Sequence, residues 1–200
     1  RSFAKGMTLR SLKLPDTVRD IDAGFLENTT TDVPKGMRVL DLSLLDALRS
    51  IGDRFACRSD IEKFALPPKC ALRSIGESFL AGTTRLVAVD LGACAELRRI
   101  PDDFCSGAVA ITRVSLPPEL THIGDNFCKG ARRLKELRMA RCVKLVAIGS
   151  SFASETGLTA IVLTPAVTSI GRGFAYGAKE LTTIEMDRCE GLTSIPASFA

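Results

Sequence analysis

Short blocks of alternating apolar and polar residues recur along the whole chain. Each block has the form apolar-x-x-apolar-x-apolar, as in LVAVDL (86–91) and ITRVSL (111–116). The last apolar residues of a block alternate with period two, which predicts a short β-strand with one buried face. Eight blocks begin 23 to 28 residues apart, at positions 9, 37, 61, 86, 111, 134, 158 and 181. One short structural unit is therefore repeated about eight times.

A second pattern, an isoleucine four positions before a phenylalanine, lies between the blocks. It reads VTSIGRGFA at 167–175 and LTSIPASFA at 192–200. The residue after the isoleucine is glycine or proline, and because proline holds φ near −65°, we expect a turn of negative φ whose glycines allow close packing. We predict that this turn lies on the convex side and that its isoleucine and phenylalanine fill the core. The phenylalanines of the series are Phe3, Phe25, Phe55, Phe79, Phe104, Phe127, Phe152, Phe174 and Phe199.

The repeats are expected to stack, because one short strand buries too little apolar surface to be stable alone. We predict an α/β repeat solenoid that forms a single domain over residues 1–200, with about eight repeats of 23–28 residues. Short parallel strands are expected on its concave face, and mostly irregular turns with short helical turns on its convex face. Both ends fall in mid-repeat, at Phe3 and Phe199, so we expect a fragment of a longer protein.

The turn sequences carry a family resemblance. The strings LPPELTHIGDNF (116–127) and LTPAVTSIGRGF (163–174) are each followed by a new apolar block. This sequence pattern resembles that of the BspA-like leucine-rich repeat family, and the resemblance extends over essentially the whole chain. It implies a leucine-rich repeat solenoid that serves in protein recognition or adhesion, without catalysis and without a cofactor. Where that family often has cysteine after Phe-x-x-Gly, this chain has Thr83, Ala108, Ala131 and Ala178.

Composition changes this picture little. The 27 basic and 23 acidic residues give a net charge of +4, which is too balanced to favour nucleic acid or an anionic membrane as a partner. There is no tryptophan and one tyrosine, so few rings are available for stacking bases. No apolar run approaches the roughly 18 residues of a membrane-spanning helix, and no signal peptide is visible near Arg1.

The seven cysteines raise the question of disulfides and metals. Three occupy the same position in alternate repeats, about 10 Å apart, which is too far for a bridge, and we expect them to be small buried residues: Cys94, Cys142 and Cys189. Cys105 and Cys128 lie at one position in adjacent repeats, which is close enough for a bridge, whereas Cys57 and Cys70 have no obvious partner. Because no Cys-x-x-Cys pair occurs, we expect no metal site.

Cysteine usage and the family resemblance favour different compartments. An odd, mostly buried set of cysteines favours a reducing, cytoplasmic location. The resemblance leaves the cell surface as the alternative. The long polar stretch 26–36 interrupts the repeat rhythm and contains Asn28 in a glycosylation sequon, which would matter only for a secreted protein.

Candidate catalytic residues are few. His122 is the only histidine, and a nucleophile pair with Cys128 is conceivable, but the same repeat positions hold serine, arginine or alanine elsewhere. Phosphate-binding glycine loops and the Gly-x-Ser-x-Gly motif are missing from the sequence. We therefore expect no enzymatic activity.

Charged residues at the outward strand positions are the candidate binding residues. The basic run at 132–144 contributes Arg138, which together with Arg113 forms a basic patch. Asp41, Asp90 and Glu185 on the same face make the surface mixed in sign, which suits protein recognition better than nucleic acid. The predicted partner-binding residues are Lys13, Asp41, Lys63, Asp90, Arg113, Glu136, Arg138 and Glu185.

We therefore predict a non-catalytic interaction module or scaffold that binds a protein partner on its concave face. Two alternatives remain: a cell-surface adhesin or receptor ectodomain, and a repeat domain that regulates a larger enzyme.

Overall fold

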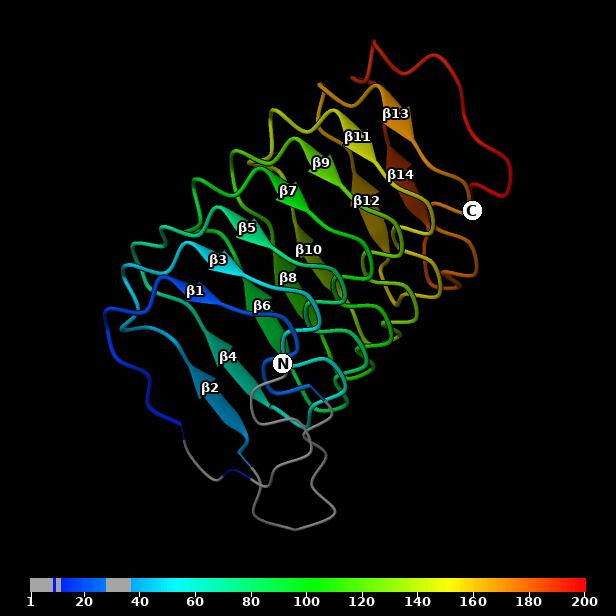
Figure 1. The fold of residues 1–200 in the computed structure, drawn as a ribbon. Helices are drawn as coiled ribbons and strands as arrows, with labels where there is room; N and C mark the ends of the chain where they lie inside the picture. Colours follow the sequence, from blue (N-terminus) through cyan, green and yellow to red (C-terminus); the bar gives the residue numbers. More distant parts are fainter. Residues whose placement is uncertain (1–8, 10–11, 28–36) are drawn as a thin grey trace.

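Two rows of short parallel strands run along the length of the molecule (Figure 1). The computed structural model describes residues 9, 12–27 and 37–200. The long-strand row comprises β2 (Val39–Asp41), β4 (Lys63–Ala65), β6 (Ala88–Asp90), β8 (Arg113–Ser115), β10 (Glu136–Arg138), β12 (Ala160–Val162) and β14 (Thr183–Glu185). The short-strand row comprises β1 (Asp20–Ile21), β3 (Ser50–Ile51), β5 (Ser74–Ile75), β7 (Arg99–Ile100), β9 (His122–Ile123), β11 (Ala147–Ile148) and β13 (Ser169–Ile170).

The long strands follow from the alternating blocks. In each strand the central residue points into the core and its two neighbours point outward. The central residues of β6, β8 and β10 pair in register, Val89 with Val114 and Val114 with Leu137. Seven of the eight predicted blocks carry a strand at the expected place. The eighth block, at 9–14, includes residues 10–11, which lie outside the described part of the chain.

The short-strand row was not predicted. The sequence pattern assigned the segment around each Ile-Gly to a turn, but the isoleucine and the residue before it form a second parallel ladder. Ser50 and Ile51 of β3, for example, pair with Ser74 and Ile75 of β5. The core is therefore enclosed by two strand rows and not by one sheet backed by turns alone.

The α/β class and the short helical turns were wrong. Among the described residues there is no helix, and the fold is a parallel β-solenoid. The physical reason lies in the convex turn, where the residue before each described phenylalanine of the repeating series has a positive φ between 53° and 72°. These residues are Gly24, Arg54, Ser78, Asp103, Asn126, Ser151, Gly173 and Ser198. A right-handed helix cannot continue through such a position.

The convex turn has its own hydrogen-bond ladder. Successive coils are joined by backbone N–H groups that donate to the carbonyls of the following coil: Ser78 to Asp102, Leu80 to Phe104 and Gly82 to Ser106, at 3.0, 2.8 and 2.7 Å. This regular pairing satisfies backbone groups that would otherwise be buried without partners. The turns predicted as irregular are thus a third repeating ladder.

The phenylalanines form one continuous stack beneath these turns, as the sequence pattern predicted. The rings of Phe79 and Phe104 are 5.4 Å apart and inclined by 6°, and both side chains are fully buried. The stack extends from Phe25 to Phe199, with neighbouring ring centroids 5.0 to 5.6 Å apart. Phe3 lies outside the described residues.

The glycines after isoleucine allow close packing, as predicted. A Cβ atom at Gly76 would lie 2.2 Å from the backbone nitrogen of Asp53 in the preceding coil, and at Gly124 it would lie 2.7 Å from that of Asp102. Neither glycine has a positive φ. The absence of a side chain, and not a left-handed conformation, is what the fold requires at these positions.

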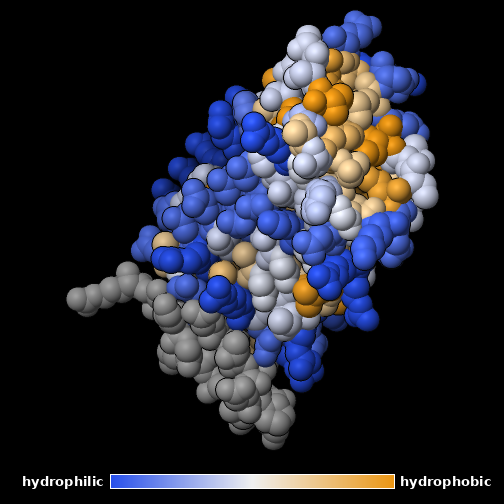
Figure 2. All heavy atoms as spheres, turned by 90° about the vertical axis from the view of Figure 1, so that its right-hand side faces the viewer, coloured by the Kyte–Doolittle hydropathy of each residue, from blue (hydrophilic) through white to orange (hydrophobic). Residues whose placement is uncertain are grey.

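Apolar side chains are not buried evenly along the solenoid. On the side seen in Figure 2, hydrophobic residues gather toward the C-terminal end, while hydrophilic residues cover much of the remaining surface. Leu181, Ile184 and Leu192 of the last coils are only partly buried against the core. The equivalents of Leu181 in central coils, such as Leu134 and Ile111, are completely buried.

Candidate functional site

The predicted binding residues lie on the outer side of the long-strand row, which we call the long-strand face. Asp41, Lys63, Asp90, Arg113, Glu136, Arg138 and Glu185 occupy outward strand positions, and all seven are exposed. Lys13 is also exposed, but it lies outside any strand. The pattern of alternating residues therefore placed the strand residues on one surface.

A hollow of about 1000 Å³ lies on this face and extends from β4 to β12. Asp90, Glu136 and Arg138 line it, whereas Lys63 and Arg113 do not. Small residues form much of its lining: Ala65, Gly92, Ala93, Ser115, Ala140 and Ala160. None of these small residues was among the predicted binding residues, which are all charged, although small residues at outward strand positions were visible in the sequence.

Opposite charges are arranged across neighbouring strands in this hollow. Ser115 of β8 is in register with Asp90 of β6 on one side and with Arg138 of β10 on the other. Two residues earlier, Arg113 is in register with Glu136. The face therefore presents charges of both signs on neighbouring and next-neighbouring strands, with the buried hydroxyl residue Ser115 between Asp90 and Arg138.

Two of the predicted residues also stabilise the ends of their own strands. The Oδ1 atom of Asp41 accepts a hydrogen bond from the backbone N–H of Ser43, and Oδ1 of Asp90 accepts one from Gly92, both at 2.9 Å. Hydrogen bonds from the side chain and backbone of Ser43 lower the pKa of Asp41 below its ordinary value. These carboxylates fold the chain back after the strand, as Asx turns do.

The predicted basic patch is partly neutralised. Nε of Arg138 donates to Oε1 of Glu136 on the same strand. Arg113 makes no ion pair with any described residue. The long-strand face is thus a mixed surface in which Arg113 carries the least compensated positive charge of the hollow's central strands.

The basic run at 132–144 pairs with carboxylates one or two coils away. Arg132 contacts Glu155 at 3.2 Å, Lys144 contacts Glu119, and Lys135 contacts Glu180. All of these side chains are substantially exposed, and exposed pairs contribute about 0–1 kcal/mol each. The pairs order the surface more than they stabilise it.

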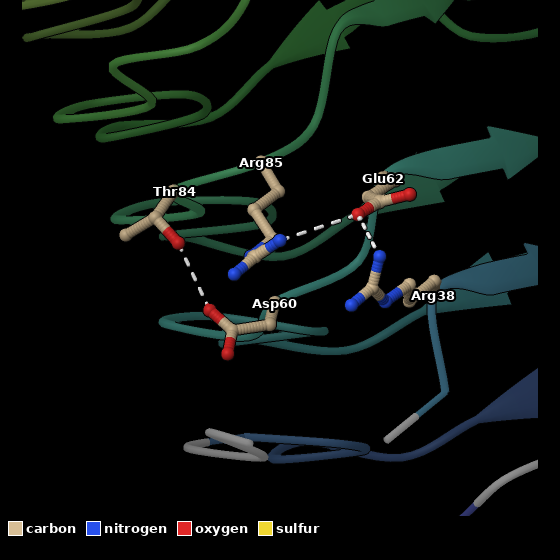
Figure 3. A network of polar contacts seen from close by, with 5 residues as sticks. All are labelled: Arg38, Asp60, Glu62, Thr84 and Arg85. Atoms are coloured by element: carbon tan, nitrogen blue, oxygen red, sulfur yellow. Dashed lines mark hydrogen bonds and ion pairs between the residues drawn. The ribbon is translucent and has the colours of Figure 1, made fainter. Parts of the chain in front are cut away.

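A similar network joins three coils at the edge of the long-strand row. Glu62 accepts from Arg38 at 3.0 Å and from Arg85 at 3.4 Å, and Asp60 accepts from Thr84 at 2.9 Å (Figure 3). Each of these residues comes directly before or close to a long strand. Because Arg38, Glu62 and Arg85 pair with one another between coils, their charges are already compensated and this edge is a poor site for ion pairs with a partner.

The prediction for Cys70 and Cys94 was wrong. Cys70 is bridged to Cys94 of the next coil, with Cα atoms 4.7 Å apart, although no partner was expected for Cys70 and no bridge for Cys94. Cys70 lies 24 residues before Cys94, at about one repeat, so the two cysteines are in adjacent coils, whereas the predicted spacing of about 10 Å applies to cysteines two coils apart. Cys105 and Cys128 are buried and not bridged.

The remaining thiols are buried, as expected for core residues. Sγ of Cys142 donates to the carbonyl of Pro117, and Sγ of Cys189 to that of Thr164, both at 3.3 Å. Burial raises the pKa of Cys142 to about 11. Burial also raises the pKa of Cys128 well above its ordinary value, so this thiol is not a ready nucleophile.

The other candidate chemistry finds no support in the described residues. The Nδ1 atom of His122 contacts Oγ1 of Thr121 at 2.9 Å. Within the described ranges, no three His, Cys, Asp or Glu side chains are close enough together to hold a metal ion. A search of the same ranges for a helix that is long and apolar enough to cross a membrane found none. Asn28 lies outside the described residues.

Comparison with known proteins identifies the repeat. The family model described as BspA type leucine rich repeat region matches in 6 copies, over residues 35–148 and 93–199. The chain belongs to the BspA-type leucine-rich repeat family. BspA-type repeats are typical of protein-interaction or repeat modules, and the family and fold are typically non-enzymatic. The comparison with curated proteins found no match.

A solved structure shares the fold. A leucine-rich repeat protein from Bacteroides ovatus ATCC 8483 superimposes with a TM-score of 0.54 at 20% sequence identity. The match covers 90% of this chain and 52% of that protein, so this BspA-type chain spans about half of its length. At this level of identity the likeness shows the fold alone.

Proposed function

We propose that this chain is a non-catalytic recognition module whose long-strand face binds a protein partner. The observation that carries the proposal is the hollow of about 1000 Å³ between β4 and β12. Its lining of small side chains lets a partner come close to the strands, and its charged residues can fix the orientation of that partner. Concave surfaces of this kind are what solenoid proteins use for binding.

The charges of the face favour a protein over a nucleic acid. Asp90, Glu136 and Glu185 are exposed on the same face as Arg113 and Arg138. Phosphates would be repelled by the three carboxylates, whereas a protein segment can supply both signs of charge. A partner carboxylate near Arg113 and a partner amine near Asp90 would complete the arrangement.

A second candidate function is that of a cell-surface recognition module, such as an adhesin or a receptor ectodomain. The bridge between Cys70 and Cys94 favours it, because disulfides persist in oxidising compartments. Five free buried thiols favour the reducing compartment of an intracellular scaffold. Regulation of a larger enzyme stays a hypothesis from the sequence alone.

Alkylation of the protein from its own cells distinguishes the two compartments. Without prior reduction, seven alkylated cysteines in the unfolded protein would indicate an intracellular scaffold. Five alkylated cysteines, with Cys70 and Cys94 reacting only after reduction, would indicate an oxidising location.

Photo-crosslinking tests the proposed binding face. A photoreactive phenylalanine analogue would be placed at Ala88 or Thr183, which point outward from β6 and β14 and do not line the hollow, and the protein expressed in its own cells. We expect both positions to crosslink the same partner, and the same analogue at Lys129 on the convex turn to crosslink it weakly. Equal yields from all three positions, or no product from the long-strand face, would contradict the proposal.

A further inference from the structure

Four arginines form a column at the edge of the short-strand row, on a surface separate from the long-strand face. They occupy one position in successive repeats, directly before the outward residue of β1, β3, β5 and β7: Arg19, Arg49, Arg73 and Arg98. The N–H of Arg49 donates to the carbonyl of Arg19 at 2.7 Å, and that of Arg73 to Arg49 at 2.8 Å. Backbones in such a ladder lie about 4.8 Å apart. We call this set the arginine column.

Most of the column is uncompensated. All four arginine side chains are exposed. Arg73 donates to Oε2 of Glu96 at 2.7 Å, but Arg19, Arg49 and Arg98 make no ion pair within the described ranges. The neighbouring Arg99 on β7 adds a further charge without such a pair. Like charges at this spacing repel one another, so the column does not stabilise the fold.

An acidic row lies across the short strands, and the structure explains it without a partner. Oδ1 of Asp53 accepts a hydrogen bond from the backbone N–H of Glu77 at 2.9 Å, and Oδ1 of Asp102 accepts one from that of Asp125 at 2.8 Å. Oδ1 of Asp125 in turn accepts a hydrogen bond from the backbone N–H of Ser150 in the next coil. These carboxylates join one coil to the next. Of the four arginines, only Arg73 makes such a side-chain contact to the next coil within the described ranges, to Glu96.

The acidic row is offset from the arginine column along the chain. Asp53 follows Arg49 by four positions, and Asp102 follows Arg98 by four. Asp102 and Asp125 line the same hollow as Arg98, so a ligand beside the column meets these carboxylates too, but their Oδ1 atoms already accept backbone hydrogen bonds.

The column continues into an apolar surface in the later coils. Thr121 and Val146 occupy the arginine position in the next two repeats, and the N–H of Val146 donates to the carbonyl of Thr121 at 2.9 Å. Val146 and the nearby Val143 are 40% and 61% exposed. A hollow of about 900 Å³ lies beside the column, and its lining includes Arg73, Arg98 and Thr121 as well as the carboxylates of Glu96, Asp102 and Asp125. The strip therefore changes from basic to apolar along the solenoid axis.

We propose that the arginine column binds an extended acidic segment of a protein partner, with apolar residues of that segment contacting Val143 and Val146. Five strand spacings separate Arg19 from Val146, or about 24 Å, which matches an extended segment of about seven residues. The apolar end of the strip favours a protein over a nucleic acid, whose phosphates would meet no positive charge there. No phenylalanine or tyrosine lines the adjacent hollow, and His122 is the one ring there on which a base could stack.

Binding of fluorescent poly-L-glutamate tests this proposal, with an oligothymidylate of equal charge as the competing probe. In 50 mM salt we expect Arg49→Glu/Arg98→Glu to weaken poly-L-glutamate binding at least ten-fold. The matched variant Arg113→Glu/Arg138→Glu, which changes the net charge equally on the long-strand face, should change it less than two-fold. Circular dichroism would verify that both variants are folded.

Three outcomes would overturn the proposal. They are no binding of poly-L-glutamate by the unmodified chain, equal losses in the two variants, and tighter binding of oligothymidylate than of poly-L-glutamate. The second outcome would show that net charge alone attracts the probe, and the third would favour a nucleic acid. Failure of the long-strand face to bind a protein partner would leave these results unchanged, because the probe and the variants test a different surface.

Discussion

Ser115 of β8 lies directly between Asp90 of β6 and Arg138 of β10, in register with both. A small buried residue thus separates two opposite charges at the centre of the long-strand face. This relationship creates the depth of the hollow, because larger side chains stand on either side of a short one. The binding proposal depends on that depth as much as on the charges.

Filling the hollow should abolish binding without unfolding the protein. Ala160 points outward from β12 and lines the hollow, so the ring of Ala160→Trp would occupy the space that a partner needs. We expect partner affinity to fall at least ten-fold and the melting temperature to change by no more than about 2 °C, because the site is exposed. Titration of the crosslinked partner against the unmodified protein and against Ala160→Trp measures the two affinities. Thr168→Trp, on the short-strand side, is the control and should bind the partner as the unmodified protein does.

Removing one ring from the phenylalanine stack should be costly. Phe104 is fully buried and stacked on Phe79 and Phe127 at 5.4 and 5.5 Å, so Phe104→Ala leaves a cavity and breaks two ring contacts. We expect a loss of about 3–5 kcal/mol in the free energy of unfolding, measured by urea denaturation. Phe104→Leu should lose less, because it fills more of the cavity. A loss below 1 kcal/mol for the alanine variant would show that the stack is not a stabilising element.

Adding a single methyl group at a tight coil contact should also destabilise the fold. A Cβ at Gly76 would lie 2.2 Å from the nitrogen of Asp53, and backbone on both sides would have to move. We expect Gly76→Ala to lower the free energy of unfolding by about 1–3 kcal/mol. Ser74→Ala, an exposed site on the same short strand, is the control and should be nearly neutral. Thermal melts of the two variants decide the matter, and similar melting temperatures would contradict the packing role.

Stability should fall at alkaline pH through Cys142. Burial raises the pKa of this thiol to about 11, from an ordinary value near 9. Between these values the unfolded chain loses the proton while the folded chain keeps it, so folding stability is complete below about pH 8.5 and decreases as the pH rises toward 11. Urea midpoints of the unmodified protein should therefore decrease more between pH 8 and 10.5 than those of Cys142→Ala. Parallel decreases in the two proteins would show that Cys142 does not contribute.

Much of the fold could be predicted because its determinants are local. Alternation in LVAVDL placed β6, and the phenylalanine spacing placed the aromatic stack. The short-strand row could not be recognised, because two-residue strands such as Ser74–Ile75 are too short to show any periodicity. Helical turns were expected where residues such as Ser78 and Asn126 adopt positive φ, which side-chain identity does not reveal.

The candidate site was predictable only in part. Outward strand positions identified Asp90, Glu136 and Arg138, because strand alternation fixes the direction of a side chain. The bridge between Cys70 and Cys94 was missed because equivalent positions had been compared only between alternate repeats. The hollow itself depends on the sizes of side chains in five neighbouring strands, which become adjacent only in the folded solenoid.

The most direct test of the binding proposal is the affinity of the crosslinked partner for two variants with equal charge change. Arg113→Glu/Arg138→Glu reverses two charges on the long-strand face, and Lys129→Glu/Arg172→Glu reverses two on the convex turn. We predict a loss of at least ten-fold in affinity for the first variant and less than two-fold for the second. Unchanged binding by the first variant, or an equal loss in both, would contradict recognition by the long-strand face.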